Sequence, residues 1–452
     1  MSVSPPIPRS VLDQLARAGD QEADAIVDAA IDSLGLGSPE LDSSERRSAY
    51  PEVMRQIGSG DDGGPVDDFV WGGGEIDAQI NVDLVNRAQD FFEEHGVAII
   101  TALFLASLPE AYLGRRGVQV LDMTGELVSN WSRRIQETGQ FLINVMTRDR
   151  AIADDSKTNL HHGETGARVA RRVRLAHSAV RWLLRAPYNP PLRLEFREVL
   201  AEPRTLWHLR MAQIGEPIGP DLSEPLNQED LLGTLGTFTT VVFDALDKLA
   251  VGYDDRDREA YDHLWNIVGW HLGIGHNGAL PSGVTTGLDP PRWPGNEILP
   301  LTVDEMDAIF TDLQDRLTGE TEAGRRLAQT LVQDFAYPLP RSMQAGPAFV
   351  VRYLIGDTRA NKLDIRGGGY TGLLVRHTGA LTWLAARTRT SYVGELVLSA
   401  VAQSLTRYAL RHFVARSLES ERGLRIEPHT ASRWGIQIGP GSSTHETPAV
   451  SV

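Results

Sequence analysis

The stretch Arg168-Val-Ala-Arg-Arg-Val-Arg-Leu-Ala-His-Ser-Ala-Val-Arg-Trp-Leu-Leu-Arg185 predicts an amphipathic helix and contains the most informative residue of the chain, His177. At 3.6 residues per turn, one face holds a single imidazole among apolar side chains, in the order Val173, His177, Val180 and Leu184. A second face holds guanidinium groups, namely Arg174, Arg181 and Arg185. The pattern places one titratable ring on an apolar surface beside a row of cations.

Two interpretations of His177 follow from this pattern. A neutral imidazole can ligate haem iron, apolar walls suit a porphyrin, and Arg174 and Arg181 could bind its propionates. Alternatively, His177 is a hydrogen-bonded core residue, which is the more frequent role of a histidine on an apolar helix face. The arginines would then form a solvated face. The helix alone does not decide between these interpretations.

Length and composition bound the class of protein. The 452 residues, of which 41% are hydrophobic, are enough for one large domain or a few smaller ones. The net charge of −16 does not favour binding to nucleic acid or to an anionic membrane through the overall field. The sequence has no cysteine, which excludes disulfides, iron–sulfur clusters, Cys-based zinc sites and a thiolate-ligated haem.

The sequence also predicts where the protein acts. The first residues lack a charged segment followed by an apolar core, so we expect no signal peptide. The longest apolar run, Val97 to Leu108, suits a buried helix and is too short to span a bilayer. We therefore expect a cytoplasmic protein with no stable membrane insertion and no nucleic-acid partner.

Helical periodicity dominates the chain and predicts an all-α fold. Strand-type alternation is scarce, and Tyr370–Arg376 is the best short candidate. From residue 79 onward we expect helices near residues 79–95, 97–112, 124–147, 164–186, 201–214, 227–252, 257–274, 302–317, 321–337 and 340–356, with further helices between 378 and 421. Asp and Glu in the first turn of the helix near 227–252 agree with the helix dipole.

Three segments are expected along the chain. Residues 1–75 are predicted to form an N-terminal helical extension, with helical patterns at Val11–Leu34 and Ser44–Ile57 and a loop at Gly58–Gly74. Residues 76–423 would form the main domain. Residues 424–452 are polar and rich in Gly, Ser, Thr and Pro, which predicts a flexible C-terminal tail.

A second constellation lies on the predicted helix near 124–147. Arg134 and Thr138 are four residues apart and share a face, and Glu137 projects to the same side because it follows Arg134 by three residues. The spacing fits a polar group on one wall of a pocket. Taken alone, the pattern is more typical of a surface ion pair between Arg134 and Glu137, with Thr138 incidental.

The RRxxxT stretch at 133–138, followed by Val173-Arg-Leu-Ala-His-Ser-Ala-Val-Arg181, resembles the latex clearing proteins (rubber oxygenases) and the wider oxygenase family that shares their catalytic domain. Further similar stretches occur in order along the chain: His95–Ile99, Ser107–Tyr112, Pro225–Leu232, Phe238–Phe243, Trp265–Gly269 and Leu272–Ile274. The resemblance covers roughly residues 80–420. It rests on the order and spacing of these stretches together.

This resemblance implies a globin-like helical bundle enclosing one haem b. It identifies His177 with the axial ligand of the iron, and Arg134 and Thr138 with residues of the distal pocket. Rubber oxygenases have a lysine three residues after that arginine, where this chain has Glu137. A carboxylate binds ferric iron more weakly than an amine does and more readily exchanges a proton. Glu137 is thus expected either to act as a base or to shape the pocket by pairing with an arginine.

The expected function is that of a haem b-dependent oxygenase. Dioxygen and a small apolar substrate, an alkene such as a terpenoid or lipid, would be its partners, and oxidative cleavage of C=C is the outcome that the resemblance implies. The exchange of lysine for Glu137 also leaves room for hydroxylation or peroxidase-like chemistry. Two alternatives remain: a non-catalytic haem-binding or redox-sensing protein on the same scaffold, and an all-α protein without haem in which His177 is a core residue.

Overall fold

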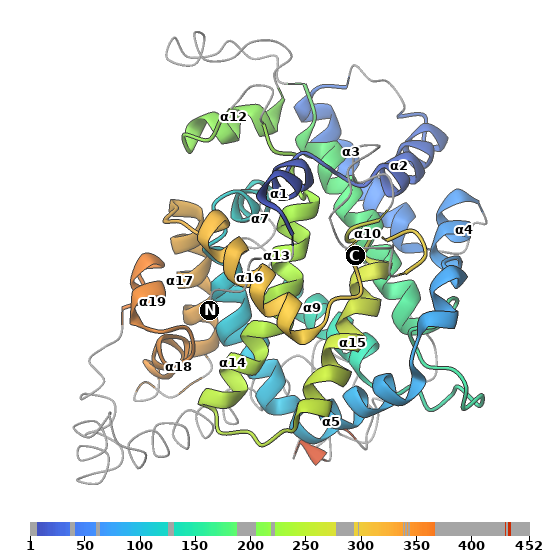
Figure 1. Cartoon of the computed structure of the whole chain (residues 1–452). Helices are drawn as coiled ribbons and strands as arrows, with labels where there is room; N and C mark the ends of the chain where they lie inside the picture. Colours follow the sequence, from blue (N-terminus) through green and yellow to red (C-terminus); the bar gives the residue numbers. More distant parts are fainter. Residues whose placement is uncertain are drawn as a thin grey trace.

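The computed structural model confirms the all-α prediction (Figure 1). It describes residues 7–36, 41–59, 64–124, 131–187, 205–217, 222–276, 293–296, 298–337, 339, 341, 344–366, 430, 433 and 434, without the side chains of residues 59 and 131–136. Within these ranges the chain forms helices joined by turns, and β-type pairing is limited to isolated bridges. The strand candidate Tyr370–Arg376 and the helices expected between 378 and 421 lie outside the described residues.

The first half of the chain contributes the N-terminal helices and two long helices. They are α1 (Arg9–Leu15), α2 (Gln21–Ser33), α3 (Ser43–Ser59), α4 (Pro65–Trp71), the 3-10 helix η1 (Gly74–Gln79), α5 (Val82–Ala102), the π-helical turn η2 (Leu103–Ser107), α6 (Leu108–Tyr112), α7 (Gly117–Thr124), α9 (Trp131–Met146) and α10 (Thr165–Leu184). The second half contributes α12 (Leu206–Gln213), α13 (Gln228–Phe238), α14 (Thr240–Lys248), α15 (Asp255–His271), α16 (Val303–Leu317), α17 (Glu322–Ala336), α18 (Gly346–Ile355) and α19 (Asp357–Lys362).

Local sequence explains where most helices begin. Asp20, Asn81 and Asn227 each accept a hydrogen bond from a backbone N–H of the first turn of α2, α5 and α13. Reciprocal capping boxes start α15 at Asp254 and α16 at Thr302. These caps satisfy N–H groups that a helix leaves without an internal partner, so the helix starts are fixed by short-range chemistry.

Several details differ from the expected helices. The segment expected at Val11–Leu34 is divided into α1 and α2, and α7 (apart from its last residue) and α19 lie outside the expected ranges. The two helices expected at 79–95 and 97–112 are continuous through the π-helical turn η2. The single helix expected at 227–252 is divided at Thr239, whose backbone (φ −108°, ψ −82°) leaves the helical region. The loop expected at Gly58–Gly74 contains the helix α4, which begins with Pro65 at a position where proline is favourable.

The main core lies where α5 packs along α15. Both helices contribute fully buried aromatic side chains: Phe92 comes from α5, and Tyr261 and Trp265 come from α15. Phe243 of α14 meets Tyr261 edge to face, with ring centroids 5.3 Å apart. Burial of these large apolar surfaces is the main favourable contribution to folding.

The continuous helix Val82–Tyr112 is long and apolar enough to cross a membrane by length and composition alone. In this structure 72% of its most apolar window is buried against other helices, as in the core helix of a globular protein. Such a helix is therefore weak evidence for a membrane span. The expectation of a cytoplasmic protein without stable membrane insertion stays a prediction.

The N-terminal helices pack on the main domain. Apolar side chains of α2, α3 and α4 form a cluster with Leu175, Ala176 and Ala179 of α10, and Figure 1 shows these helices beside α10. The expected tail lies outside the described residues apart from Thr430, Arg433 and Trp434. Trp434 is buried against α5, where its indole N–H donates to the carbonyl oxygen of Glu93.

Candidate functional site

Helices α9 and α10, which carry the predicted site residues, form a helical hairpin. Gly166 lies against α9, because a Cβ atom built on it would be 3.0 Å from the carbonyl oxygen of Asn144. The amide of Asn159 donates to the carbonyl oxygens of Asn144 at 2.6 Å and Thr147 at 3.0 Å, at the end of α9. Gln89 of α5 donates to the same Asn159 at 2.6 Å and fixes it to the core.

In this hairpin, the predicted site residues of α9 and of α10 lie at similar distances from the Asn144–Gly166 contact. The two helices pack along each other and run in opposite directions from the Asn144–Gly166 contact. His177 follows Gly166 by eleven residues, and Arg134 precedes Asn144 by ten, so both lie about 15 Å from the contact at 1.5 Å per residue. Thr138 and Glu137 lie one turn closer to it. Counted along the two helix axes, the backbone of Arg134 and that of His177 therefore lie at similar distances from the contact.

His177 is half-buried, and its Nδ1 atom is shielded from solvent. Val180 and Leu184, on the same face of α10, belong to a buried apolar cluster with Val120 of α7 and with Trp207 and Met211 of α12. An imidazole that ligates iron through one nitrogen usually turns the other toward the protein. The shielded Nδ1 and the neighbouring apolar cluster therefore fit an axial ligand at the edge of an apolar site.

The arginine face of α10 has carboxylate partners. Arg174 is 1% exposed and binds Asp20 through two hydrogen bonds of 2.6 and 2.9 Å, while a third, of 2.7 Å, goes to Glu22. Arg181, also 1% exposed, donates to Asp24 at 2.8 Å. The alternative expectation, that the arginines form a solvated face, is therefore wrong for Arg174 and Arg181. These ion pairs occupy the cations that we expected to bind propionates, so that role stays a prediction while a structural role is evident.

Glu137 and Thr138 are half-buried on α9. The side chain of Arg134 lies outside the described residues, so its pairing with Glu137 is not tested. Phe141, one turn beyond Thr138, contacts Trp265 of the main core with ring centroids 6.5 Å apart. This contact fixes the rotation of α9 one turn from Glu137 and Thr138.

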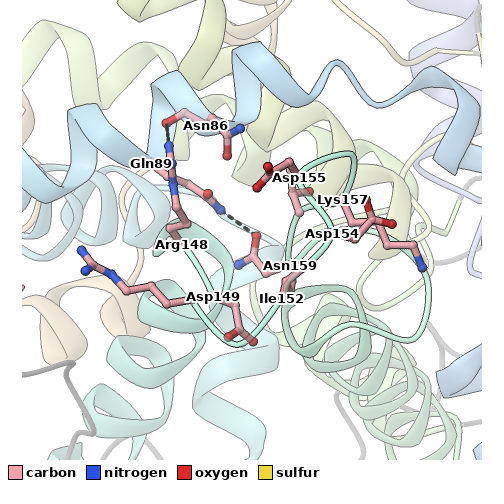
Figure 2. A pocket seen from close by; sticks show the side chains of 11 residues that line it. Asn86, Gln89, Arg148, Asp149, Ile152, Asp154, Asp155, Lys157 and Asn159 are labelled. Carbon is pink, nitrogen blue, oxygen red and sulfur yellow. Dashed lines mark hydrogen bonds between the residues drawn. The ribbon is translucent and has the colours of Figure 1, made fainter.

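A polar cavity of about 240 Å³ lies between α5 and the loop that joins α9 to α10. Figure 2 shows its walls, which include Asn86, Arg148, Asp155, Lys157 and Asn159. None of the predicted site residues lines it. Its amides and charges do not suit an apolar substrate or a porphyrin, so we do not assign the expected chemistry to this cavity.

Two carboxyl groups that the sequence does not mark as functional are buried. Glu110 of α6 lies 3.3 Å from Arg359, and burial raises its pKa to about 7 even though Arg359 and Lys248 lower it. Burial likewise raises the pKa of Asp262 to about 7. Glu110 lies in Ser107–Tyr112, one of the family-like stretches, but no local pattern signals that its carboxyl group is buried.

Comparisons with known proteins identify relatives of the chain. Residues 96–390 match the family described as "ER-bound oxygenase mpaB/B'/Rubber oxygenase, catalytic domain". The fold is similar to the solved structure of latex clearing protein LCP in the closed state, with a TM-score of 0.57, 18% sequence identity, and coverage of 88% of this chain and 91% of that one. At this identity the likeness shows the fold. Comparison with curated proteins gives no significant match.

Proposed function

Because the chain belongs to the mpaB/rubber oxygenase catalytic-domain family, a family of oxygenases, we propose that it is a haem b-dependent oxygenase acting on a small apolar alkene. The proposal extends the family's oxygenase activity to a cofactor and a substrate class for this chain. The observation that supports it is the packing of α9, which carries Arg134, Glu137 and Thr138, against α10, which carries His177.

His177 would hold the haem iron through its imidazole, with the shielded Nδ1 turned toward the protein. Bound haem would supply dioxygen activation and electron transfer. Val120, Val180 and Leu184 would form part of the apolar wall. These apolar neighbours would suit an apolar substrate, because an apolar molecule leaves no polar group unsatisfied beside them.

On the α9 side, Arg134 would donate hydrogen bonds and stabilise negative charge that develops next to it. Thr138 would orient the same region through its hydroxyl group. Glu137 stands where the resemblance to rubber oxygenases implies a lysine, and its carboxylate would accept and return a proton during turnover. A carboxylate is also a weaker iron ligand than a lysine amine, so this face would not supply a strong ligand of its own.

The test measures dioxygen uptake by the purified, haemin-loaded chain with short isoprenoid alkenes. Oxidative cleavage adds both atoms of O₂ across C=C and gives two carbonyl groups, so ¹⁸O₂ should label both carbonyl products. Arg134→Ala should lower the rate by about 100-fold, the loss typical of a single charge-stabilising donor. A haem-loaded protein that consumes no dioxygen with any alkene would favour the non-catalytic haem-binding alternative.

A further inference from the structure

Helix α2 of the N-terminal extension runs beside α10 and pairs its acids with the arginine face. Asp20, the N-cap of α2, binds Arg174. Asp24, one turn later, accepts hydrogen bonds from Arg181 and from Arg185, both at 2.8 Å. Acids four residues apart on α2 thus meet arginines seven residues apart on α10. The two helices are joined by successive ion pairs along one side.

The Arg174–Asp20 pair is buried, whereas the pairs of Asp24 with Arg181 and Arg185 are partly buried. Burial alone would raise the pKa of Asp20, but the charge and hydrogen bonds of Arg174 outweigh it, so the pKa lies below its usual value. A buried guanidinium that loses its carboxylate keeps its desolvation cost, which makes a broken buried pair expensive. The α1–α2 turn is held as well, because Gln228 donates its side-chain amide to the carbonyl oxygen of Gly19 at 2.9 Å. Helix α2 therefore has one preferred position on α10.

The contacts reach the residues on both sides of His177. Ala176 and Ala179 pack on an apolar cluster that contains Ala23 and Val27 of α2. The hydroxyl group of Ser178 donates a hydrogen bond to Asp24. Neighbouring residues on a helix point about 100° apart, so fixing residues 176, 178 and 179 fixes the direction of the Cα–Cβ bond of His177 between them.

We propose that α2 positions the iron ligand, with Asp24 as the main positioning residue. Asp24 holds Ser178, Arg181 and Arg185 together and thereby sets the rotation of α10 and the direction of the His177 imidazole. Asp20 performs the same task one turn earlier through Arg174. This inference rests on the proposed haem site, and it assigns to the N-terminal extension a function outside the matched domain, which begins at residue 96.

The control variant must lose a comparable ion pair that does not involve α10. Asp307 accepts hydrogen bonds from the hydroxyl group of Thr240 at 2.7 Å and from Arg258 at 2.7 and 2.6 Å. Like Asp24, it binds one hydroxyl group and a guanidinium, although Asp24 binds two arginines and Asp307 binds one. Asp307 joins α14, α15 and α16 and makes no contact of this kind with α10. Asp307→Asn is therefore matched in chemistry to Asp24→Asn and differs in location.

The experiment compares full-length wild type, D24N and D307N after loading with haemin. We expect D24N to release haem to apomyoglobin about tenfold faster than wild type and to change the electron paramagnetic resonance spectrum of the ferric iron, as is typical when a residue that orients a metal ligand is lost. D307N should lower the melting temperature similarly and leave the haem release rate and the spectrum unchanged. Equal effects of D24N and D307N would overturn the inference.

A milder variant covers the case in which D24N does not fold. Ser178→Ala removes only the hydroxyl group that donates to Asp24, next to His177. It should shift the ferric spectrum in the direction seen for D24N, and a wild-type spectrum would overturn the inference while leaving the proposed function intact. Wild-type protein that takes up no haemin would overturn both together.

Discussion

Gly166 of α10 lies directly against the backbone of Asn144 of α9, and only a residue without a side chain fits between them. A Cβ atom there would be 2.8 Å from the carbonyl oxygen of Asn159 and 3.0 Å from that of Asn144. Neither oxygen can move without moving the backbone. This glycine therefore sets how closely the end of α9 approaches the start of α10.

We predict that Gly166→Ala destabilises the protein by about 1–3 kcal/mol, the usual cost of forcing an extra group into a tightly packed position. Urea unfolding followed by circular dichroism measures the change. The matched control is Gly117→Ala in the first turn of α7, where the nearest atom to a Cβ is 3.8 Å away. That variant should be as stable as wild type or more stable, because Ala favours helix over Gly. A neutral Gly166→Ala would show that the hairpin contact is not tight.

The raised pKa of Glu110 predicts how the stability of the protein depends on pH. Its pKa in the folded protein is raised to about 7 by burial, while in the unfolded chain it is near the usual 4.5. The neutral form of Glu110 makes its full contribution to the free energy of unfolding below pH 4.5. This contribution is lost as the pH rises through about 7, because the folded protein must then hold a buried charge. The loss is at most about 3 kcal/mol.

Thermal unfolding between pH 5 and pH 8.5 checks this behaviour. Glu110→Gln cannot ionise, so its melting temperature should fall less than that of wild type as the pH rises. Glu94→Gln is the control, because the Glu94 side chain is 73% exposed and its removal should leave the pH dependence of wild type in place. Parallel curves for wild type and Glu110→Gln would contradict the assigned pKa.

Glu137 stands where the resemblance to rubber oxygenases implies a lysine, and its proposed role as a base can be tested directly. Glu137→Gln keeps the size and hydrogen-bonding capacity of the side chain but cannot exchange a proton, so we expect alkene-dependent turnover to fall by about 100-fold with haem binding retained. Gln140→Ala serves as control, because Gln140 binds Asn144 on the same helix. Unchanged turnover in Glu137→Gln would leave the residue only a role in shaping the pocket.

Much of the fold could be predicted from sequence because its signals are local. The helices that became α9, α10, α16 and α17 show apolar residues at helical spacing, and capping residues such as Thr302 mark where they begin. The division at Thr239 was not predictable, since neither Gly nor Pro stands there. Helix α4 was missed because the Gly- and Asp-rich sequence around it is typical of a loop.

The site could be predicted only in part, for a different reason. The pattern around His177 shows an imidazole and a row of arginines, and the family-like stretches predict His177 as the iron ligand. The partners of those arginines, Asp20 and Asp24, lie about 150 residues away in the extension, as the separations of their hydrogen bonds show. A local sequence pattern does not show contacts between residues so far apart. The sequence therefore predicts only propionates or solvent as partners of these arginines.

The absorption spectrum of the purified full-length chain tests the central claim, that His177 holds a haem. Wild type loaded with haemin should show the Soret band of a histidine-ligated haem, and His177→Ala should lose it. His162→Ala is the control, because His162 is half exposed and bound to Asp77. A wild type that takes up no haemin, or a His177→Ala variant with the wild-type spectrum, would contradict the account.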